Sequence, residues 1–217
     1  MRTFGFPDFL FILEAAKWTL SLSLIAFIGG AILGLLIALA RTSESKTARL
    51  LSTGFIQIFQ GTPLLLQLFL IFFGAPVIGF DINPWVAAGV ALVLNSAAFL
   101  GEIWRGCIEA IPRGQTEAAH ALNLGYASRM RDVVLPQAFK IALAPTVGYG
   151  VQIIKGTSLA AIIGFTEVTR AGQIINNATF QPLYVFTTVA AIYFAICWPL
   201  SLMAARMERR RARALAR

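Results

Sequence analysis

Side chains that could act as acids, bases, nucleophiles or metal ligands are few and scattered in this chain of 217 residues. The one histidine is His120, and a single histidine in a polar stretch is more often a surface residue than a catalytic base. Cys107 and Cys197 have no metal-ligand spacing and are not expected to pair. There is no G-x-S-x-G elbow, and residues 148–158 have the wrong spacing for a phosphate loop. We therefore predict no catalytic residue, no metal site and no nucleotide site in this chain.

A different kind of chemistry is indicated by polar side chains within long apolar runs. Placing a polar group in the hydrocarbon layer of a membrane costs free energy, so such a group is expected to line a cavity or a pathway. Lys155 lies too far from the end of its run to reach water, so it either meets a substrate carboxylate or belongs to a structural ion pair or gate. Glu102 and Arg105 are predicted to form an intrahelical pair. The predicted substrate path consists of Asn95, Ser96, Gln152, Lys155, Thr157 and Ser158.

The elements that hold these side chains are predicted to be transmembrane helices. Hydrophobic residues make up 58% of the chain, charged residues only 13%, and the mean hydropathy is +0.74. A bilayer core needs about 20 apolar residues per helix. Residues 4–17 are expected to lie at the interface, and Gly61-Thr62-Pro63 is expected to break the second span. We predict an all-α membrane protein, one domain over residues 1–217, with five spans at about 18–40, 55–73, 85–104, 141–165 and 183–205.

Arginine and lysine residues set the expected orientation in the membrane. The segments after the first and third predicted spans, together with the C-terminal tail, hold 14 of the 18 basic residues. Because basic residues gather in cytoplasmic segments, we predict that the N-terminus lies outside and the C-terminus in the cytoplasm. The same asymmetry explains the net charge of +8. The charge therefore implies a lipid bilayer as partner, and no nucleic acid.

A polar, alanine-rich segment over residues 112–136 separates the third and fourth predicted spans, which places it in the cytoplasm. Thr116 is expected to cap a short helix with Glu117 in its first turn. Asn123–Gly125 should end this helix because asparagine and glycine tolerate left-handed backbone, and a second short helix is expected over 130–134. The small side chains suit a groove on another protein, but a connector lying on the lipid headgroups would show the same pattern.

Residues 117–136, EAAHALNLGYASRMRDVVLP, resemble the EAA loop of the membrane subunits of binding-protein-dependent ABC importers. Four further stretches are similar to the polar-amino-acid permeases of that class. They are FQGTPLLLQLFLIFFG, LNSAAFLGEIWRGCIEAIPRGQ, KGTSLAAIIGFTEVTRAGQ and WPLSLMAARMERR. Five matches in order, spread over nearly the whole chain, are far more specific than any one of them alone.

The resemblance implies a five-helix permease core of the type I importer fold, paired in the bacterial inner membrane with a second copy or a paralogue. It also implies an extracytoplasmic amino-acid-binding protein, and a cytoplasmic ABC ATPase dimer that binds ATP and magnesium. The loop between the third and fourth helices would couple to this ATPase through Glu117, Ala118, Ala119, Leu122, Asn123 and Gly125. The family has glycine where this chain has Asn123. Since asparagine accepts left-handed backbone, the turn is expected to persist.

The predicted function is that of the permease subunit of an ATP-driven importer, which moves a polar amino acid or a close derivative by alternating access. An ion-coupled carrier or channel would need no docking helix, and a membrane enzyme would need a reactive cluster. Many relatives read N-E where this chain reads Gly148-Tyr149, which favours a neutral, acidic or bulkier substrate over a cationic one. The residues leave open which amino acid is carried and whether the two permease subunits are identical.

Overall fold

Helices account for nearly all of the described chain, which comprises residues 2–215 of the computed structural model. Arg217 of the predicted basic tail lies outside these residues. Four helices in the described part are long and apolar enough to cross a membrane, and the bent pair α2–α3 gives a fifth candidate. The prediction of an all-α membrane protein is confirmed. The elements are α1 (Phe6–Thr42), α2 (Lys46–Gly61), α3 (Leu64–Val77), α4 (Pro84–Glu109), α5 (Arg113–Ala121), α6 (Tyr126–Ser128), the π-helical η1 (Arg129–Val134), α7 (Leu135–Gly156), the 3₁₀ segment η2 (Thr157–Ile163), α8 (Val168–Thr179) and α9 (Pro182–Leu215).

The first helix, α1, begins well before the start of the first predicted span. Pro7 lies in its first turn, where a missing N–H leaves no hydrogen bond unmade, and the Asp8 carboxylate accepts a hydrogen bond from the N–H of Gly5 at 3.0 Å. No further proline interrupts the 37 residues of α1, which therefore run as one helix of roughly 55 Å. Most of residues 4–17 form the first turns of α1, which continue without a break into the first predicted span.

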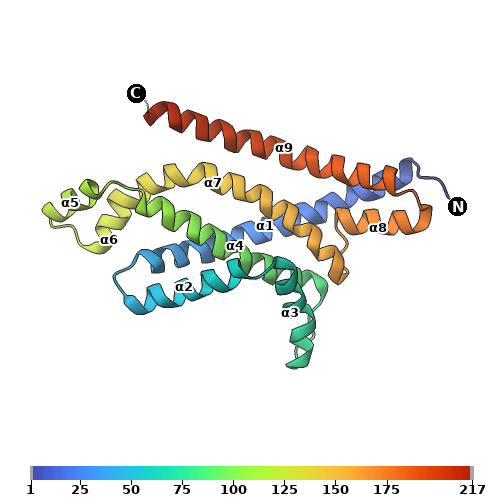
Figure 1. Ribbon diagram of the computed structural model, residues 1–217, viewed down its shortest axis with the longest axis horizontal. Helices are drawn as coiled ribbons and strands as arrows, with labels where there is room; N and C mark the ends of the chain where they lie inside the picture. The colour runs from blue at the N-terminus through green and yellow to red at the C-terminus, as the bar shows by residue number, and fades with distance from the viewer. Residues whose placement is uncertain (1, 216–217) are drawn as a thin grey trace.

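The second predicted span is broken where Gly61-Thr62-Pro63 predicts a break. The axes of α2 and α3 differ by 100°. Thr62 is extended, with φ −115° and ψ 140°, because the ring of Pro63 disfavours helical backbone at the residue before it. Figure 1 shows α3 projecting away from the long axis of the molecule. Residues 55–73 are therefore not one straight crossing element.

The contact between α1 and α4 is the most extensive helix contact in the fold. Gly30 and Gly34 lie one turn apart on α1 and allow the two backbones to approach closely. A methyl group added at Gly30 would lie 2.5 Å from Cβ of Ser96, and one at Gly34 would lie 3.1 Å from the carbonyl oxygen of Ala97. This is the close approach that small residues four apart permit between membrane helices.

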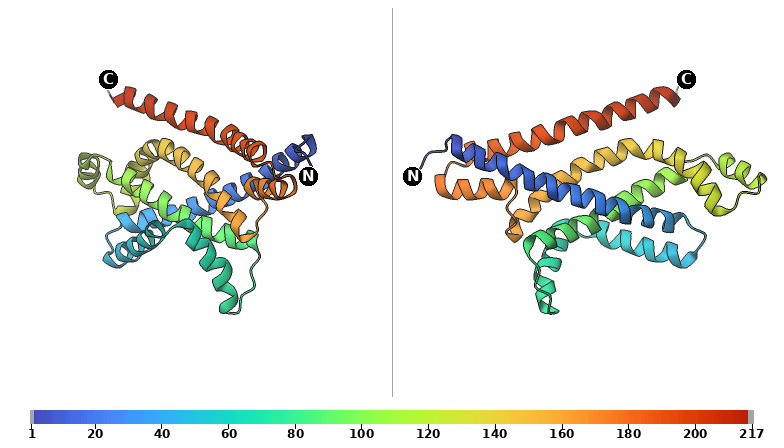
Figure 2. Two further views of the ribbon diagram at one scale, coloured as in Figure 1. Left: turned by 45° about the vertical axis from the view of Figure 1, so that its right-hand side comes forward. Right: turned by 180° about the vertical axis from the view of Figure 1, so that it is seen from behind.

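Figures 1 and 2 show an elongated molecule with a different set of elements at each end. α5, α6, the turn between α1 and α2, and the end of α9 lie at one end. The start of α1, α8 and the start of α9 lie at the other. The short helix α8 packs there through Val168 and Ile175 against Ile12 of α1 and Val185 of α9. The fold thus separates the loop before α7 from the loop after it along the length of the molecule.

Candidate functional site

The first half of the predicted coupling loop is α5, and it starts one turn earlier than expected. Thr116 does not cap it, because the residue before the helix is Pro112, whose backbone is at φ −55° and ψ 135°. Proline cannot continue a preceding helix, but its fixed φ is compatible with the entry into a new one. Thr116 therefore lies inside α5, and Glu117 lies in its second turn instead of the first.

The end of α5 is a left-handed turn centred on Asn123, whose φ is 57°. The N–H of Leu124 donates to the carbonyl of Ala119 at 3.0 Å, and the N–H of Asn123 donates to the carbonyl of His120 at 2.8 Å. These two bonds are the pair that defines a Schellman helix end, with the left-handed residue in the position usually held by glycine. The prediction that asparagine preserves this turn is confirmed.

Replacing Asn123 with valine is expected to weaken the turn, because a β-branched residue in left-handed backbone costs about 1–2 kcal/mol. Hydrogen–deuterium exchange at the Asn123 and Leu124 amides should then be roughly 5–30 times faster than in the unchanged protein. The matched Asn123→Gly variant should exchange at the original rate or more slowly. Equal exchange in the valine variant and the unchanged protein would show that these amides do not depend on the turn.

The loop returns to the membrane through a continuous helix, not through the separate short helix expected over 130–134. α6 passes into η1 and then into α7 without a break. Arg129, at the start of η1, is only 8% exposed. It contacts the ring of His120, lies 3.5 Å from the Glu44 carboxylate, and places its guanidinium carbon 5.4 Å from the Tyr126 ring centre. Arg129 therefore connects α5 to the turn between α1 and α2.

Five of the six predicted coupling residues are exposed, and one is not. Leu122, at the end of α5, is a large apolar side chain that is 75% exposed. Ala119 is only 2% exposed, on a helix that contacts η1. A bulky side chain at Ala119 would therefore disturb the loop itself. The exposed five are Glu117, Ala118, Leu122, Asn123 and Gly125.

A buried amide network surrounds the break between α2 and α3. Pro63 has no N–H, so the carbonyl of Phe59 lacks its usual helical partner. Gln67, which is 5% exposed, donates its amide to this carbonyl at 2.8 Å and to the carbonyl of Thr62 at 3.0 Å. Asn95 of α4 donates to the same Phe59 carbonyl at 3.3 Å and to the Gln67 side-chain oxygen at 3.2 Å. Asn95 thus helps to hold the bend.

Four of the six candidate path residues are buried or hydrogen-bonded within the chain, and the other two are exposed. The hydroxyls of Thr157 and Ser158 donate to the carbonyls of Ile154 and Lys155, each at 2.7 Å. Ser96 is buried against α1, and Asn95 belongs to the amide network. The two remaining path residues, Gln152 and Lys155, lie one turn apart on α7 and are exposed. No carboxylate among residues 2–213 forms a salt bridge with Lys155.

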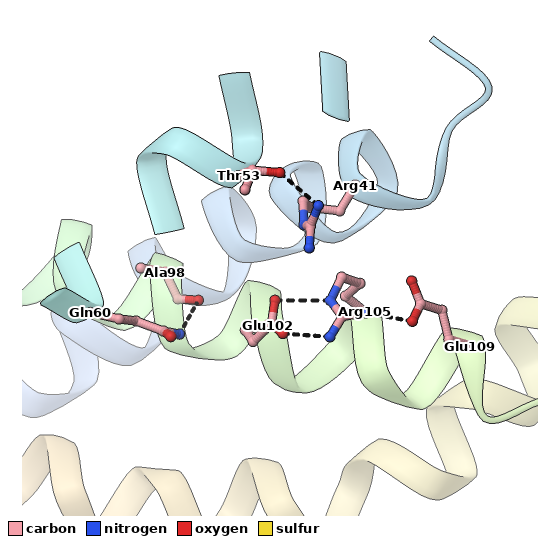
Figure 3. Close-up of polar contacts among 7 residues, drawn as sticks. All are labelled: Arg41, Thr53, Gln60, Ala98, Glu102, Arg105 and Glu109. Atoms are coloured by element: carbon pink, nitrogen blue, oxygen red, sulfur yellow. Dashed lines mark hydrogen bonds and ion pairs between the residues drawn. The ribbon is translucent and has the colours of Figure 1, made fainter. Parts of the chain in front are cut away.

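Polar contacts at the loop end of α4 are satisfied within the chain (Figure 3). Arg105 donates to Glu102 at 2.9 Å, which confirms the predicted intrahelical pair, and it also contacts Glu109. The side chain of Gln60 donates to the carbonyl of Ala98 at 3.2 Å and connects α2 to α4. These groups have internal partners, so they act as helix contacts.

The family model of binding-protein-dependent transport system inner membrane components matches residues 30–213, which include the loop and all six candidate path residues. The chain belongs to this family. It is therefore a multi-pass permease subunit of the inner membrane, with ATP binding assigned to a partner ATPase. The family also implies a binding-protein partner.

Individual relatives agree with this assignment along the whole permease. The glutamine transport system permease protein of Escherichia coli (strain K12) is 37% identical over 206 residues, which cover 94% of each chain. The arginine transport system permease protein of Bacillus subtilis (strain 168) is 36% identical over 205 residues, again 94% of each chain. A crystal structure of an amino acid ABC transporter with histidines superposes with a TM-score of 0.87 at 34% identity, over 96% of this chain and 100% of the other.

Sequence reasoning missed helix α8 of the permease and the residue that caps it. Glu167 is fully buried, and its carboxylate accepts hydrogen bonds from the N–H groups of Thr169 and Arg170 at 2.9 Å and from the hydroxyl of Tyr193 at 2.6 Å. Burial raises the pKa of Glu167, although these hydrogen bonds oppose the shift. The apolar residues of α8 recur at helical spacing directly after Glu167, and this pattern was the available signal.

Proposed function

We propose that this permease moves a polar amino acid across the inner membrane by alternating access, and that α5 with its terminal turn transmits the movement of the ATPase. The exposed tip of α5 carries the proposal. Leu122 offers a large apolar contact next to the exposed Glu117 and Ala118, and the left-handed turn at Asn123 gives the tip a defined end. An amphipathic helix of this kind suits a groove on a partner protein.

The proposed orientation has the N-terminus outside and the C-terminus in the cytoplasm. The end of α1, the start of α2, α5 and the end of α9 lie at the same end of the molecule (Figures 1 and 2), and they carry Arg41, Arg49, Arg113 and Arg209. Basic residues favour the cytoplasmic side of a membrane. This orientation would present α5 to an ATPase in the cytoplasm.

A second permease subunit, either another copy or a paralogue, is proposed to complete the substrate path. Gln152 and Lys155 are exposed on α7 although they lie in a segment that is apolar enough to span the membrane. A lysine facing lipid is costly, so an exposed lysine on a single chain is best explained by a water-filled interface with a second subunit. Substrate would pass between the two subunits.

The proposed substrate is an uncharged polar amino acid of the glutamine type. The relatives named above include a glutamine permease and an arginine permease, so the family accommodates both kinds of side chain. Tyr149 stacks on Phe99 with ring centres 5.4 Å apart, and its hydroxyl lies 3.4 Å from the Asn95 side-chain oxygen. The aromatic pair and the Tyr149 hydroxyl stand where many relatives carry an acid, which favours an uncharged side chain over a cationic one.

Reconstitution into vesicles with the ATPase and the binding protein tests this function. We expect uptake of labelled glutamine that requires ATP and both partners, and little uptake of labelled arginine. Vesicles that lack the ATPase are the control. Uptake without the ATPase, driven by an ion gradient, would overturn the importer mechanism, and preferential arginine uptake would overturn the substrate assignment.

A further inference from the structure

A cavity of about 550 Å³ lies between the turn that joins α1 to α2 and the coupling loop. Its acidic lining residues are Glu109 and Glu117, and Glu109 already contacts Arg105. Four arginines against these two glutamates give the lining a formal excess of positive charge. The arginines are Arg41, Arg49, Arg113 and Arg129.

Three of these arginines retain donors for an anion, whereas Arg129 already contacts His120 and Glu44. Arg41 donates one N–H to the Thr53 hydroxyl at 2.6 Å (Figure 3), but its buried Nε has no hydrogen-bond partner among residues 2–213. Arg49 donates to the carbonyl of Ser43 at 2.9 Å, which uses one of its five N–H groups. Arg113 forms no salt bridge within the described residues. A buried guanidinium N–H without a partner is costly, and an anion would satisfy it.

The cavity lining also includes buried apolar side chains. Four of them are less than a tenth exposed, namely Ile108, Ile111, Met130 and Val134. A ligand that matches both the arginines and these side chains needs an anionic group and an apolar part. The planar guanidinium fork matches the geometry of a phosphate group. Anionic phospholipids combine the two features, and basic pockets between helices at the cytoplasmic face are known to favour their headgroups.

We propose that this arginine cavity binds the phosphate headgroup of an anionic phospholipid. The bound phosphate bridges Arg41 and Arg49, which belong to α1 and α2, to Arg113 and Arg129, which belong to the loop. It therefore holds the coupling loop against the first two helices. The proposal rests on the lining residues and on the proposed cytoplasmic orientation of this end, and not on which substrate the permease carries.

Lipid binding can be measured on the purified permease in nanodiscs. We would compare discs of phosphatidylcholine alone with discs that also contain phosphatidylglycerol, and count retained lipid by native mass spectrometry. The Arg41→Gln/Arg49→Gln variant should bind phosphatidylglycerol about fivefold more weakly for each arginine removed, which corresponds to about 1 kcal/mol per residue. The matched control is Arg209→Gln/Arg210→Gln, which removes two exposed arginines of α9 outside the cavity.

Further arms separate the alternatives. If the double variant unfolds, the exposed Arg113→Gln provides the same test at a position that does not support the fold.

Phosphatidylglycerol should also slow hydrogen exchange in α5 of the unchanged protein but not in the variant. Equal loss of lipid in the cavity and control variants would overturn the proposal, because it would indicate diffuse attraction. Stabilisation by inorganic phosphate equal to that by phosphatidylglycerol would overturn the lipid assignment. If the cavity variants no longer co-purify with the ATPase but retain lipid as the unchanged protein does, these arginines act in subunit docking instead.

Discussion

The charge reversal Glu117→Arg is expected to abolish ATP-driven uptake while the permease still inserts and folds. Glu117 is exposed and forms no salt bridge within residues 2–213, although it lines the arginine cavity, so its replacement should change the free energy of unfolding by only about 1 kcal/mol or less. In a docked interface the same change leaves an unmatched charge, at a cost of about 2–5 kcal/mol. Binding of the ATPase should weaken by roughly 30-fold or more.

Co-purification of the ATPase and uptake in vesicles measure this effect together. The matched control is Glu208→Arg, which makes the same charge change at an exposed position of α9. Leu122→Asp should behave like Glu117→Arg because it removes the apolar contact of the tip. Normal ATPase binding and uptake in both loop variants would contradict the assignment of α5 as the docking element.

Enlarging Gly30 to leucine is expected to prevent stable folding of the permease. A Cβ at this position would lie 2.5 Å from the Ser96 side chain and 3.2 Å from the Ser96 backbone, so α1 and α4 would have to separate. Overpacking a core typically costs about 1–3 kcal/mol, and the cost is higher where the obstacle is backbone. We expect little folded protein by size-exclusion chromatography, and any that remains should show a lower Tm.

The control for this prediction is Gly89→Leu. Gly89 lies in α4, the helix that packs against Gly30, but a Cβ at Gly89 would meet nothing within 4 Å. Both substitutions add the same side chain to a helical glycine of a predicted span, so they differ mainly in the space available. Similar yields and Tm values for the two variants would show that close packing at Gly30 is not required.

The features that sequence predicted well are those decided by local chemistry or by the bilayer. Long apolar runs predict spanning helices because hydrocarbon leaves the backbone few other ways to satisfy its hydrogen bonds. Pro63 predicts a break because it removes one hydrogen bond and restricts the residue before it. Asn123 predicts a left-handed turn because few other residues accept that backbone. Each of these inferences needs only a few neighbouring residues.

The features that sequence missed depend on residues far apart in the chain. The N–H of Val168, at the start of α8, donates to the hydroxyl of Thr19 at 3.3 Å, across 149 positions of sequence. The burial of Ala119 depends on η1, which follows only after the turn. Gly30 and Gly34 are visible as a spaced pair, but their importance depends on the α4 residues opposite them. The path residues Gln152 and Lys155 are exposed in a single chain, so their contacts cannot be read from its sequence alone.

The bend between α2 and α3 has a consequence for biogenesis. The carbonyl of Phe59 receives hydrogen bonds from Gln67, on the helix made next, and from Asn95, on the helix made after that. When α2 and α3 leave the ribosome, Asn95 has not yet been inserted, so the amide network is incomplete. The bend can reach its final hydrogen bonding only after α4 enters the bilayer. Insertion of α4 therefore also completes the hydrogen bonding of the bend before it, and the two steps of membrane assembly are linked.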